Sequence, residues 1–231
     1  MTGRLNSPII MNHEGEKMYM YKMQLDKMGE RCLKSLGGFF DDLPRTNHAD
    51  GNYRLRRYSR VSMSQETMVY ETLDGQTFTQ SSEYNGFQGD ITRTFENINQ
   101  DVIRSYGFWE LCTRFLNSCN LPAHNVVETH QMRVITLGDE THVSPEGVHQ
   151  DGYDSICIAS VNRHNVTGGR LLVHKEKDSE PIVSIALENG ELAYINDRVL
   201  WHNATPMSRT DPSREGYMDL IILTASKNVT S

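Results

Sequence analysis

Apolar residues recur with a helical period in the first half of the chain. Residues 16–36 (EKMYMYKMQLDKMGERCLKSL) have apolar positions at spacings of three and four, which predicts an amphipathic helix that ends at Gly37 and Gly38. Residues 98–120 (INQDVIRSYGFWELCTRFLNSCN) have a similar spacing and predict a second helix, with Asn99 or Asp101 as its N-cap. Between these two segments, residues 54–63 (RLRRYSRVSM) alternate in the way of a β-strand.

The pattern changes at about Val126, where short β-rich runs separated by turn residues begin. They are HQMRVITL, DSICIASVNR, GRLLVHK, PIVSIAL, ELAYIND and MDLIILTAS. Such a series is typical of a barrel or a double-sheet jelly roll. The sequence therefore predicts one α+β, mainly β domain over residues 1–231. Its helices would lie outside a β core, with an N-terminal helical region at 1–44 and the core at 126–225.

The overall charge narrows the classes of function. The 231 residues carry a formal net charge of -7, which argues against a nucleic-acid-binding surface. No apolar run is long enough to span a membrane, and the first residues lack the apolar core of a secretion signal, so we expect a cytoplasmic protein. The four cysteines form no C-x-x-C pair, which predicts ordinary buried thiols.

The stretch GVHQDGYD (147–154) carries the strongest chemical signal, a histidine and a carboxylate two positions apart. Residues i and i+2 of an extended segment point to the same face, so His149 and Asp151 can bind one ion. His202, downstream in NDRVLWHNATPM, supplies a third ligand. Two histidines and one carboxylate form the open facial triad of non-haem Fe(II) oxygenases.

The remaining histidines are weaker candidates for metal binding. A second His-x-Asp pair, His48 and Asp50, lies in a polar loop far upstream of the β-rich half and is the weaker candidate. A structural or surface role is the expectation for His164 and His174, and His130 is expected to be a buried core residue. A structural zinc site is disfavoured because such sites are usually closed and cysteine-rich.

Several blocks extend the signal beyond the triad. They are RRYSR (56–60), EYNGFQGDITRTFENI (83–98), HQMR (130–133), PEGVHQDG (145–152), NRHNVTGG (162–169), NDRVLWHNATPM (196–207) and GYMDLIILT (216–224). In these blocks and their order, residues 45 to 225 resemble the 2-oxoglutarate/Fe(II)-dependent dioxygenases of the free amino acid hydroxylase type, of which isoleucine hydroxylase is a member.

This resemblance implies a double-stranded β-helix fold in which His149, Asp151 and His202 bind Fe(II). It also implies 2-oxoglutarate as co-substrate, O₂ as oxidant and ascorbate as a supporting reductant. The expected reaction is hydroxylation of an unactivated C–H bond of a free L-amino acid or a close derivative, with release of succinate and CO₂. Because Asp151 is a carboxylate and not a small residue, no position is left for chloride, which favours hydroxylation over halogenation.

One position departs from the family pattern. Family members usually carry an arginine immediately before the aspartate of the last block, where it pairs with the far carboxylate of 2-oxoglutarate. Here that position is Met218, which cannot form a bidentate pair with a carboxylate. Arg214 and Arg133, with Gln131 close to Arg133, are the candidates for this contact, or else the co-substrate is altered or the enzyme weakened.

An amino acid substrate needs a cation for its carboxylate and an anion or amide for its ammonium. One arginine of the patch Arg54, Arg56, Arg57 and Arg60 could point inward to bind a carboxylate; alternatively, the patch is a solvated strand face with one buried ion pair. The substrate-binding candidates are Arg57, Arg60, Tyr84, Asn85, Arg93 and Asp154.

Two other functions stay open at this stage. One is a related oxygenase that desaturates or cyclises a peptide or natural-product intermediate. The other is a jelly roll that binds a metal or small ligand without turnover. We expect a small-molecule partner, no nucleic acid and no membrane, and the sequence does not give the oligomeric state.

Overall fold

The computed structural model describes residues 23–64, 70–73, 77–83, 86–136, 138 and 140–227. Most of their regular structure is β-strand, as the sequence predicts. The strands are β1 (Met23–Lys27), β2 (Arg54–Met63), β3 (Tyr70–Leu73), β4 (Thr77–Phe78), β5 (Arg93–Thr94), β6 (Val127–Ile135), β7 (Ser155–His164), β8 (Val166–Gly168), β9 (Leu171–His174), β10 (Val183–Ile185), β11 (Glu191–Asn196), β12 (Trp201–Ala204), β13 (Met207–Arg209) and β14 (Tyr217–Ala225). The helices are α1 (Glu30–Gly37), α2 (Gln100–Ile103) and α3 (Tyr106–Ser118).

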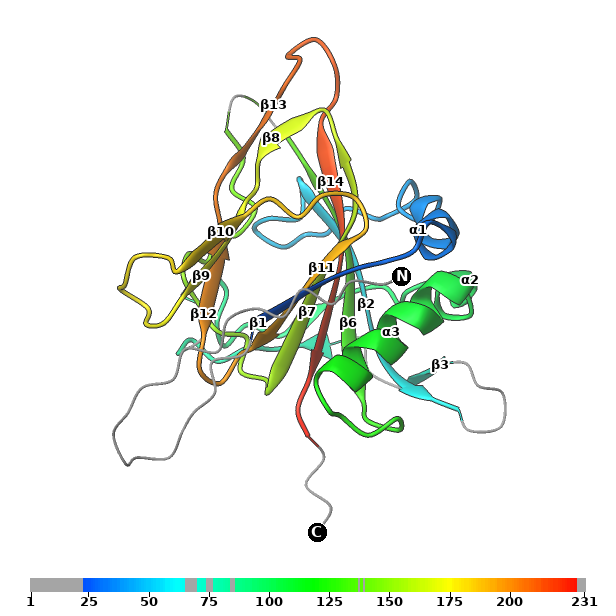
Figure 1. Cartoon of the computed structure of the whole chain (residues 1–231). Coiled ribbons are helices and arrows are strands. Elements are labelled where there is room, and N and C mark those ends of the chain that lie inside the picture. Colours follow the sequence, from blue (N-terminus) through cyan, green and yellow to red (C-terminus); the bar gives the residue numbers. More distant parts are fainter. Residues whose placement is uncertain are drawn as a thin grey trace, which may run out of the picture.

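A seven-stranded sheet forms the centre of the molecule (Figure 1). Its strand order is β1-β11-β7-β14-β6-β2-β3, and every neighbouring pair is antiparallel. A smaller antiparallel sheet, β10-β9-β12, lies on one side of it, and the pairs β13-β8 and β4-β5 complete the β structure. All six β-rich runs predicted after Val126 form strands, and the predicted jelly-roll core is confirmed.

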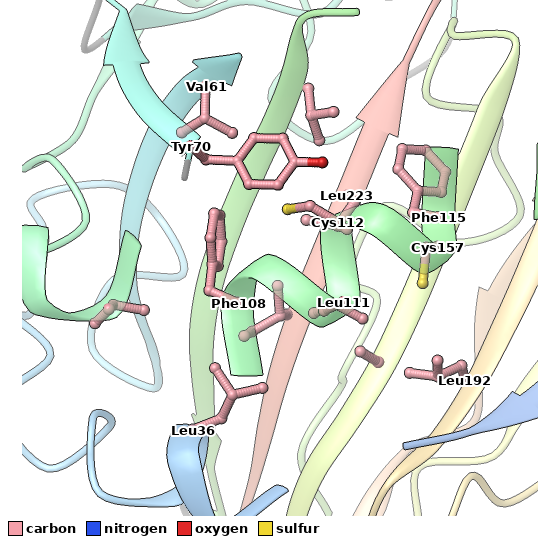
Figure 2. Close-up of a cluster of buried hydrophobic side chains, with 14 of the residues drawn as sticks. Leu36, Val61, Tyr70, Phe108, Leu111, Cys112, Phe115, Cys157, Leu192 and Leu223 are labelled. Atoms are coloured by element: carbon pink, nitrogen blue, oxygen red, sulfur yellow. The ribbon is translucent and has the colours of Figure 1, made fainter. Parts of the chain in front are cut away.

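Helices α1 and α3 pack on the opposite side of the main sheet (Figure 1). Leu36 of α1 and Phe108, Leu111 and Phe115 of α3 are fully buried there, and Figure 2 shows how they meet the strand side chains such as Leu223. Burying one such side chain contributes about 1.5–3 kcal/mol relative to leaving it exposed. This apolar layer covers one face of the sheet, so the opposite face can line a cavity.

The two-residue period of the strands assigns side chains to these two faces. On β14, Ile221 and Leu223 belong to the core under the helices, whereas Leu220 and Ile222 face the inside of the jelly roll. The strand is therefore apolar throughout because it is covered on both sides.

The N-terminal helix prediction is wrong over part of its length. Residues 16–22 lie outside the described residues, but Met23–Lys27 form strand β1, which pairs with β11 along its whole length. Backbone pairing with β11, which makes β1 the edge strand of the main sheet, outweighs the weak helical periodicity there. The predicted end of the helix is confirmed, since α1 ends at Gly37 and Gly38 caps it.

The second predicted helix is divided into α2 and α3 at Arg104 and Ser105. Ser105 has an extended backbone, and its hydroxyl accepts a hydrogen bond from the backbone N–H of Phe108. Asn99 precedes α2, as predicted for a cap, but its side chain makes no capping hydrogen bond.

The four cysteines are free thiols, as the sequence predicts. Cys32, Cys112 and Cys157 are buried free thiols, and Cys119 is a partly buried one. Within the described ranges, no helix has both the length and the apolar character needed to cross a lipid bilayer.

Candidate metal centre

His149, Asp151 and His202 come together as the sequence predicts. Each offers one ligand atom, and these atoms lie within 4.8 Å of one another. The Nε2 atoms of His149 and His202 are each 3.7 Å from a different oxygen of Asp151. The three side chains are the group of potential metal ligands that the described part of the chain brings together.

Backbone hydrogen bonds hold the two halves of this group together. His149 lies in the segment that leads into β7, and His202 lies on β12 of the small sheet. The N–H of each residue donates to the carbonyl of the other, at 3.0 and 2.9 Å. Gly147 and Gly152, on either side of His149 and Asp151, have φ angles of 74° and 89°, in the left-handed region that glycine adopts readily.

The orientation of His149 suits a metal ligand. Its Nδ1 lies 2.8 Å from the carbonyl of Gly147, so a proton on Nδ1 donates to that oxygen. The lone pair of Nε2 is then directed toward Asp151. Metal-binding histidines are usually oriented by such a hydrogen bond from the ring nitrogen that does not bind the metal.

Asp197 holds the backbone at Asp151 and lies close to the ring of His202. Its buried carboxylate accepts the backbone N–H groups of Asp151, Gly152 and Tyr153, at 2.8–3.1 Å. One of its oxygens is also 3.7 Å from Nδ1 of His202. Burial and the charge of Asp151 raise the pKa of Asp197 to about 7. Burial, followed by repulsion from His149, lowers the pKa of His202 to about 4, so this ring is neutral and able to coordinate a cation near neutral pH.

Gln80 holds Asp151 from the cavity side. Its Nε2 donates to Oδ1 of Asp151 at 2.8 Å, and its Oε1 accepts from Nη2 of Arg93 at 3.3 Å. Gln80 follows β4, whereas Arg93 lies on β5, so the β4-β5 hairpin brings both residues to the metal centre. No local pattern indicates Gln80 as a site residue, because its contact with Asp151 joins residues far apart in the chain.

A cavity of about 110 Å³ opens beside the three candidate ligands. The main sheet contributes one wall, and β9 and β12 contribute the facing wall. Much of the lining is apolar, including Phe78, Ile158, Leu171, Leu187, Leu220 and Ile222. Its polar side chains include Arg54, Arg56, Gln80, Arg93, Glu146 and Asn203.

Arg54 and Arg56 are the members of the arginine patch that point inward. Nη1 of Arg54 lies 2.9 Å from Asp50 and 3.4 Å from Glu146, while Nη2 of Arg56 lies 3.2 Å from Asp50. Burial lowers the pKa of Arg56 to about 9, with repulsion from Arg54 as the next cause. The alternative of a solvated strand face is therefore wrong for most of the patch, since Arg54, Arg56 and Arg57 are buried; the patch supplies inward-facing cations, and two of them pair with the buried Asp50.

Glu146 is a carboxylate beside the triad that no spacing or motif in the sequence marked as a site residue. Its Oε1 is 3.7 Å from Nε2 of His149, and its Oε2 faces Arg54. Burial alone would raise the pKa of Glu146, but Arg54 and His149 lower it below its usual value. The cavity wall thus presents an anion close to the metal centre, within the PEGVHQDG block that the sequence had already singled out.

The candidate co-substrate contacts on β6 face away from this cavity. Arg133 makes a bidentate ion pair with the fully buried Asp219, at 2.6 and 2.9 Å, and a further one with Asp41. Gln131 donates to the carbonyl of Phe39. The cavity side of β6 is formed by the alternate residues His130 and Met132.

Arg214 lies in the exposed turn before β14 and does not line the cavity. Met218 does line it, and Arg163 is directly opposite on β7. A β-bulge shifts the register of these two strands at Asp219 and Leu220. The shift turns Arg163 to the face of Met218, although Val161, two residues earlier, packs under the helices.

The guanidinium of Arg163 contacts the cavity-lining residue Met218, although Arg163 itself lines a neighbouring pocket with Gly168 and Glu188. Its Nη1 is 3.3 Å from Met218 Sδ, and its Nη2 donates to the carbonyl of Gly168 at 2.7 Å. Among the described residues, no carboxylate is within ion-pair distance of Arg163.

The substrate-binding candidates separate into distinct groups. Arg93 lines the cavity.

The remaining described candidates do not line the cavity. Arg57, on the helix side of β2, pairs with Asp42 and Glu96. Arg60 is partly exposed beside Glu128. Asp154 pairs with Arg198 outside the cavity. Tyr84 and Asn85 lie outside the described residues.

The other histidines have structural surroundings. His174 contacts the carbonyl of Ser179 and the side chain of Asn203, and His164 stacks on Tyr217. His130 is buried against Tyr58 and Phe78. In the second His-x-Asp pair, Asp50 is held by the two inward arginines, so this pair is not a metal site.

Comparisons with known proteins agree with this geometry. The family of 2OG-Fe dioxygenases matches residues 38–224. The chain is 25% identical over 191 residues to L-isoleucine-4-hydroxylase of Bacillus thuringiensis, covering 79% of this chain and 78% of that protein.

Solved structures share the fold. A bsmA homologue from Methylobium petroleophilum PM1 has a TM-score of 0.73 at 24% identity, over 85% of this chain and 81% of that one. IDO from Bacillus thuringiensis has a TM-score of 0.65 at 17% identity, over 89% and 90%. The family implies Fe(II), 2-oxoglutarate and O₂. The chain belongs to the 2OG-Fe dioxygenase family and is a 2-oxoglutarate-dependent non-haem iron dioxygenase.

Proposed function

We propose that the protein hydroxylates an unactivated C–H bond of a free L-amino acid or a close derivative, with release of succinate and CO₂. The observation that carries this proposal is the composition of one small cavity. It combines the three candidate metal ligands with buried arginines, the carboxylate of Glu146 and an apolar lining. These groups match the carboxylate, the ammonium and the aliphatic side chain of an amino acid. The name of the Bacillus thuringiensis relative supports the same substrate class.

In this proposal His149, Asp151 and His202 bind Fe(II), and Asp197 and Gln80 orient them. Three protein ligands leave positions open for the co-substrate and O₂. When bound, iron with 2-oxoglutarate and O₂ supplies the oxidation of the C–H bond. The protein's part is to hold the amino acid with its side chain toward the metal and to exclude water. A cytoplasmic location and the absence of a nucleic-acid partner stay predictions.

A screen of the twenty amino acids tests the function. Each is incubated with Fe(II), ascorbate and 2-oxoglutarate, and products are analysed by mass spectrometry. We expect a product heavier by one oxygen, accompanied by succinate, and no product from Asp151→Ala. His48→Ala, in the other His-x-Asp pair, is the matched control and should keep its activity. A product lighter by two hydrogens would instead indicate desaturation, and metal binding without O₂ consumption a non-catalytic jelly roll.

We further propose that Arg163 binds the far carboxylate of 2-oxoglutarate. The support is its position opposite Met218, its contact with Met218 Sδ and its lack of a carboxylate partner within the described residues. Arg214 and Arg133 are weaker candidates, because the first is exposed and the second is engaged by Asp219.

A paired substitution tests this assignment. Losing a charge-assisted pair costs about 1.5–3 kcal/mol, so Arg163→Met should raise the dissociation constant for 2-oxoglutarate roughly 10- to 100-fold. The combination of Arg163→Met with Met218→Arg should recover most of the affinity. Binding is measured by calorimetry on the Mn(II)-loaded protein without amino acid, with Arg214→Met as control. An unchanged constant in Arg163→Met contradicts the assignment.

A further inference from the structure

Three arginines and two carboxylates meet at one end of the cavity, which leaves an excess of positive charge. Arg54 is close to both acids, Asp50 and Glu146. Arg56 shares Asp50 with it. Within the described residues, Arg93 has no carboxylate at ion-pair distance; its guanidinium lies over the ring of Phe78 and donates to Gln80.

The excess positive charge lies at Arg93 and at Arg56, because Arg56 shares its one carboxylate, Asp50, with Arg54. Arg56 is 5% exposed and Arg93 is 2% exposed, and both line the cavity. The Nε of each is buried without a hydrogen-bond partner among the described residues. Buried donors of this kind are costly unless something pairs with them. Burial also lowers the pKa of both side chains, and repulsion from Arg54 lowers the pKa of each of them further.

An anion in the cavity would pair with these donors. A carboxylate suits them best, because a guanidinium can donate two parallel hydrogen bonds to its two oxygens. Inorganic anions would satisfy the charge, but the neighbouring lining of Phe78, Leu220 and Ile222 favours an organic acid with an apolar body.

A chain of two hydrogen bonds connects this end of the cavity to the metal centre. Gln80 accepts from Arg93 and donates to Oδ1 of Asp151 through the same planar amide. The hydrogen bond from Gln80 to Oδ1 restrains the rotation of the Asp151 carboxylate. A movement of Arg93 toward a bound anion would therefore change how firmly Asp151 is held.

We propose that Arg56 and Arg93 bind the carboxylate of the substrate, and that Gln80 is a positioning residue that couples occupation of this anion site to the orientation of Asp151. This inference rests on the proposed function, since it requires a substrate with a free carboxylate. It places the carboxylate of the substrate at the end of the cavity that Arg56 and Arg93 line. Loss of the Gln80 amide would remove the hydrogen bond that holds Oδ1 of Asp151, so the carboxylate would be less firmly oriented for a metal ion.

The carboxylate contact is tested with L-isoleucine and L-isoleucinamide, which lacks the carboxylate, as probes. Binding is measured without O₂ on the Co(II)-loaded protein with 2-oxoglutarate, from the visible absorption of the cobalt. We expect Arg93→Met and Arg56→Met each to weaken L-isoleucine binding at least tenfold, while isoleucinamide binds equally weakly to all forms. Arg93→Lys keeps the charge and should recover part of the affinity. The circular dichroism spectrum of each variant verifies folding.

The coupling is tested with Gln80→Leu. The wild-type cobalt spectrum should shift when L-isoleucine binds, whereas Gln80→Leu should bind the amino acid with a much smaller shift. Its kcat should fall more than its KM rises. Thr79→Val, an exposed change on the same hairpin, should behave as wild type. An equal spectral shift in Gln80→Leu and wild type overturns the coupling.

Two further outcomes separate this inference from the proposed function. If the two arginine variants weaken 2-oxoglutarate binding and leave L-isoleucine binding unchanged, the anion site belongs to the co-substrate and the inference is wrong. If no amino acid shifts the wild-type spectrum or gives product, the proposed function fails and the inference fails with it.

Discussion

The side chains of the metal centre are positioned by hydrogen bonds to neighbouring groups that are not themselves candidate ligands. The carbonyl of Gly147 determines how the His149 ring is held, and Asp197 gathers three backbone N–H groups beside Asp151. These supporting groups leave the ligand atoms themselves little freedom to rotate. A preorganised set of ligands is expected to bind a cation more tightly than a mobile one.

His130 offers a test of burial at the residue scale. Burial lowers its pKa well below the usual value of 6.5, and the nearby Arg56 and Arg93 lower it further. The unfolded chain then binds one proton more than the folded chain as the pH falls below 6.5. The free energy of unfolding of the metal-free protein should therefore decrease from about pH 6.5 downward, by at most about 1.4 kcal/mol per pH unit from this residue.

Urea denaturation across this range measures the effect. His130→Gln should show a shallower decrease in the free energy of unfolding than wild type, whatever its stability at neutral pH. His124→Gln, at an exposed loop position, is the matched control. Equal slopes in wild type and His130→Gln would contradict the prediction.

At the scale of elements, small irregularities decide which side chains reach the cavity. The bulge between β7 and β14 turns Arg163 toward Met218. Bulges commonly re-aim side chains near active sites. The β4-β5 hairpin has a similar effect, since it places Gln80 and Arg93 on one cavity wall.

The start of α3 gives a prediction at this scale. The Ser105 hydroxyl accepts the N–H of Phe108, so Ser105→Ala should lower the free energy of unfolding by about 1 kcal/mol. Asn99→Ala, before α2, should cost less because Asn99 makes no capping hydrogen bond. Urea denaturation compares the two, and an equal loss would mean that capping is not the cause.

Over the whole molecule, the candidate metal centre joins the two sheets of the jelly roll. His149 and Asp151 precede β7 of the main sheet, whereas His202 lies on β12 of the small sheet. A metal ion bound by all three binds the folded protein and not the unfolded chain. Binding should therefore stabilise the entire fold.

Metal addition and removal test this connection. With Co(II) at about 100 times its dissociation constant, the folded state should gain about 2.7 kcal/mol, seen as a higher midpoint of thermal unfolding that a chelator reverses. Asp151→Ala should lose most of the gain, while His48→Ala should keep it. A full gain in Asp151→Ala would show that the ion binds elsewhere.

The sequence anticipated the features that depend on neighbouring residues. Alternation along the strands gave the jelly-roll core, and the two-residue spacing of His149 and Asp151 placed both on one face. The choice of His202 followed from its position after a predicted strand and turn. Local periodicity determines these features because a side chain's direction is set by the backbone of its own element.

Tertiary structure alone decided the rest. Met23–Lys27 became a strand because β11 offers backbone partners, and Arg163 changed face because of a bulge that no local pattern indicates. Gln80 reaches Asp151 only through the folding of a distant hairpin. These outcomes depend on partners far away in the chain. The sequence by itself therefore determined the residue types, and the tertiary contacts determined which of these residues reach the cavity.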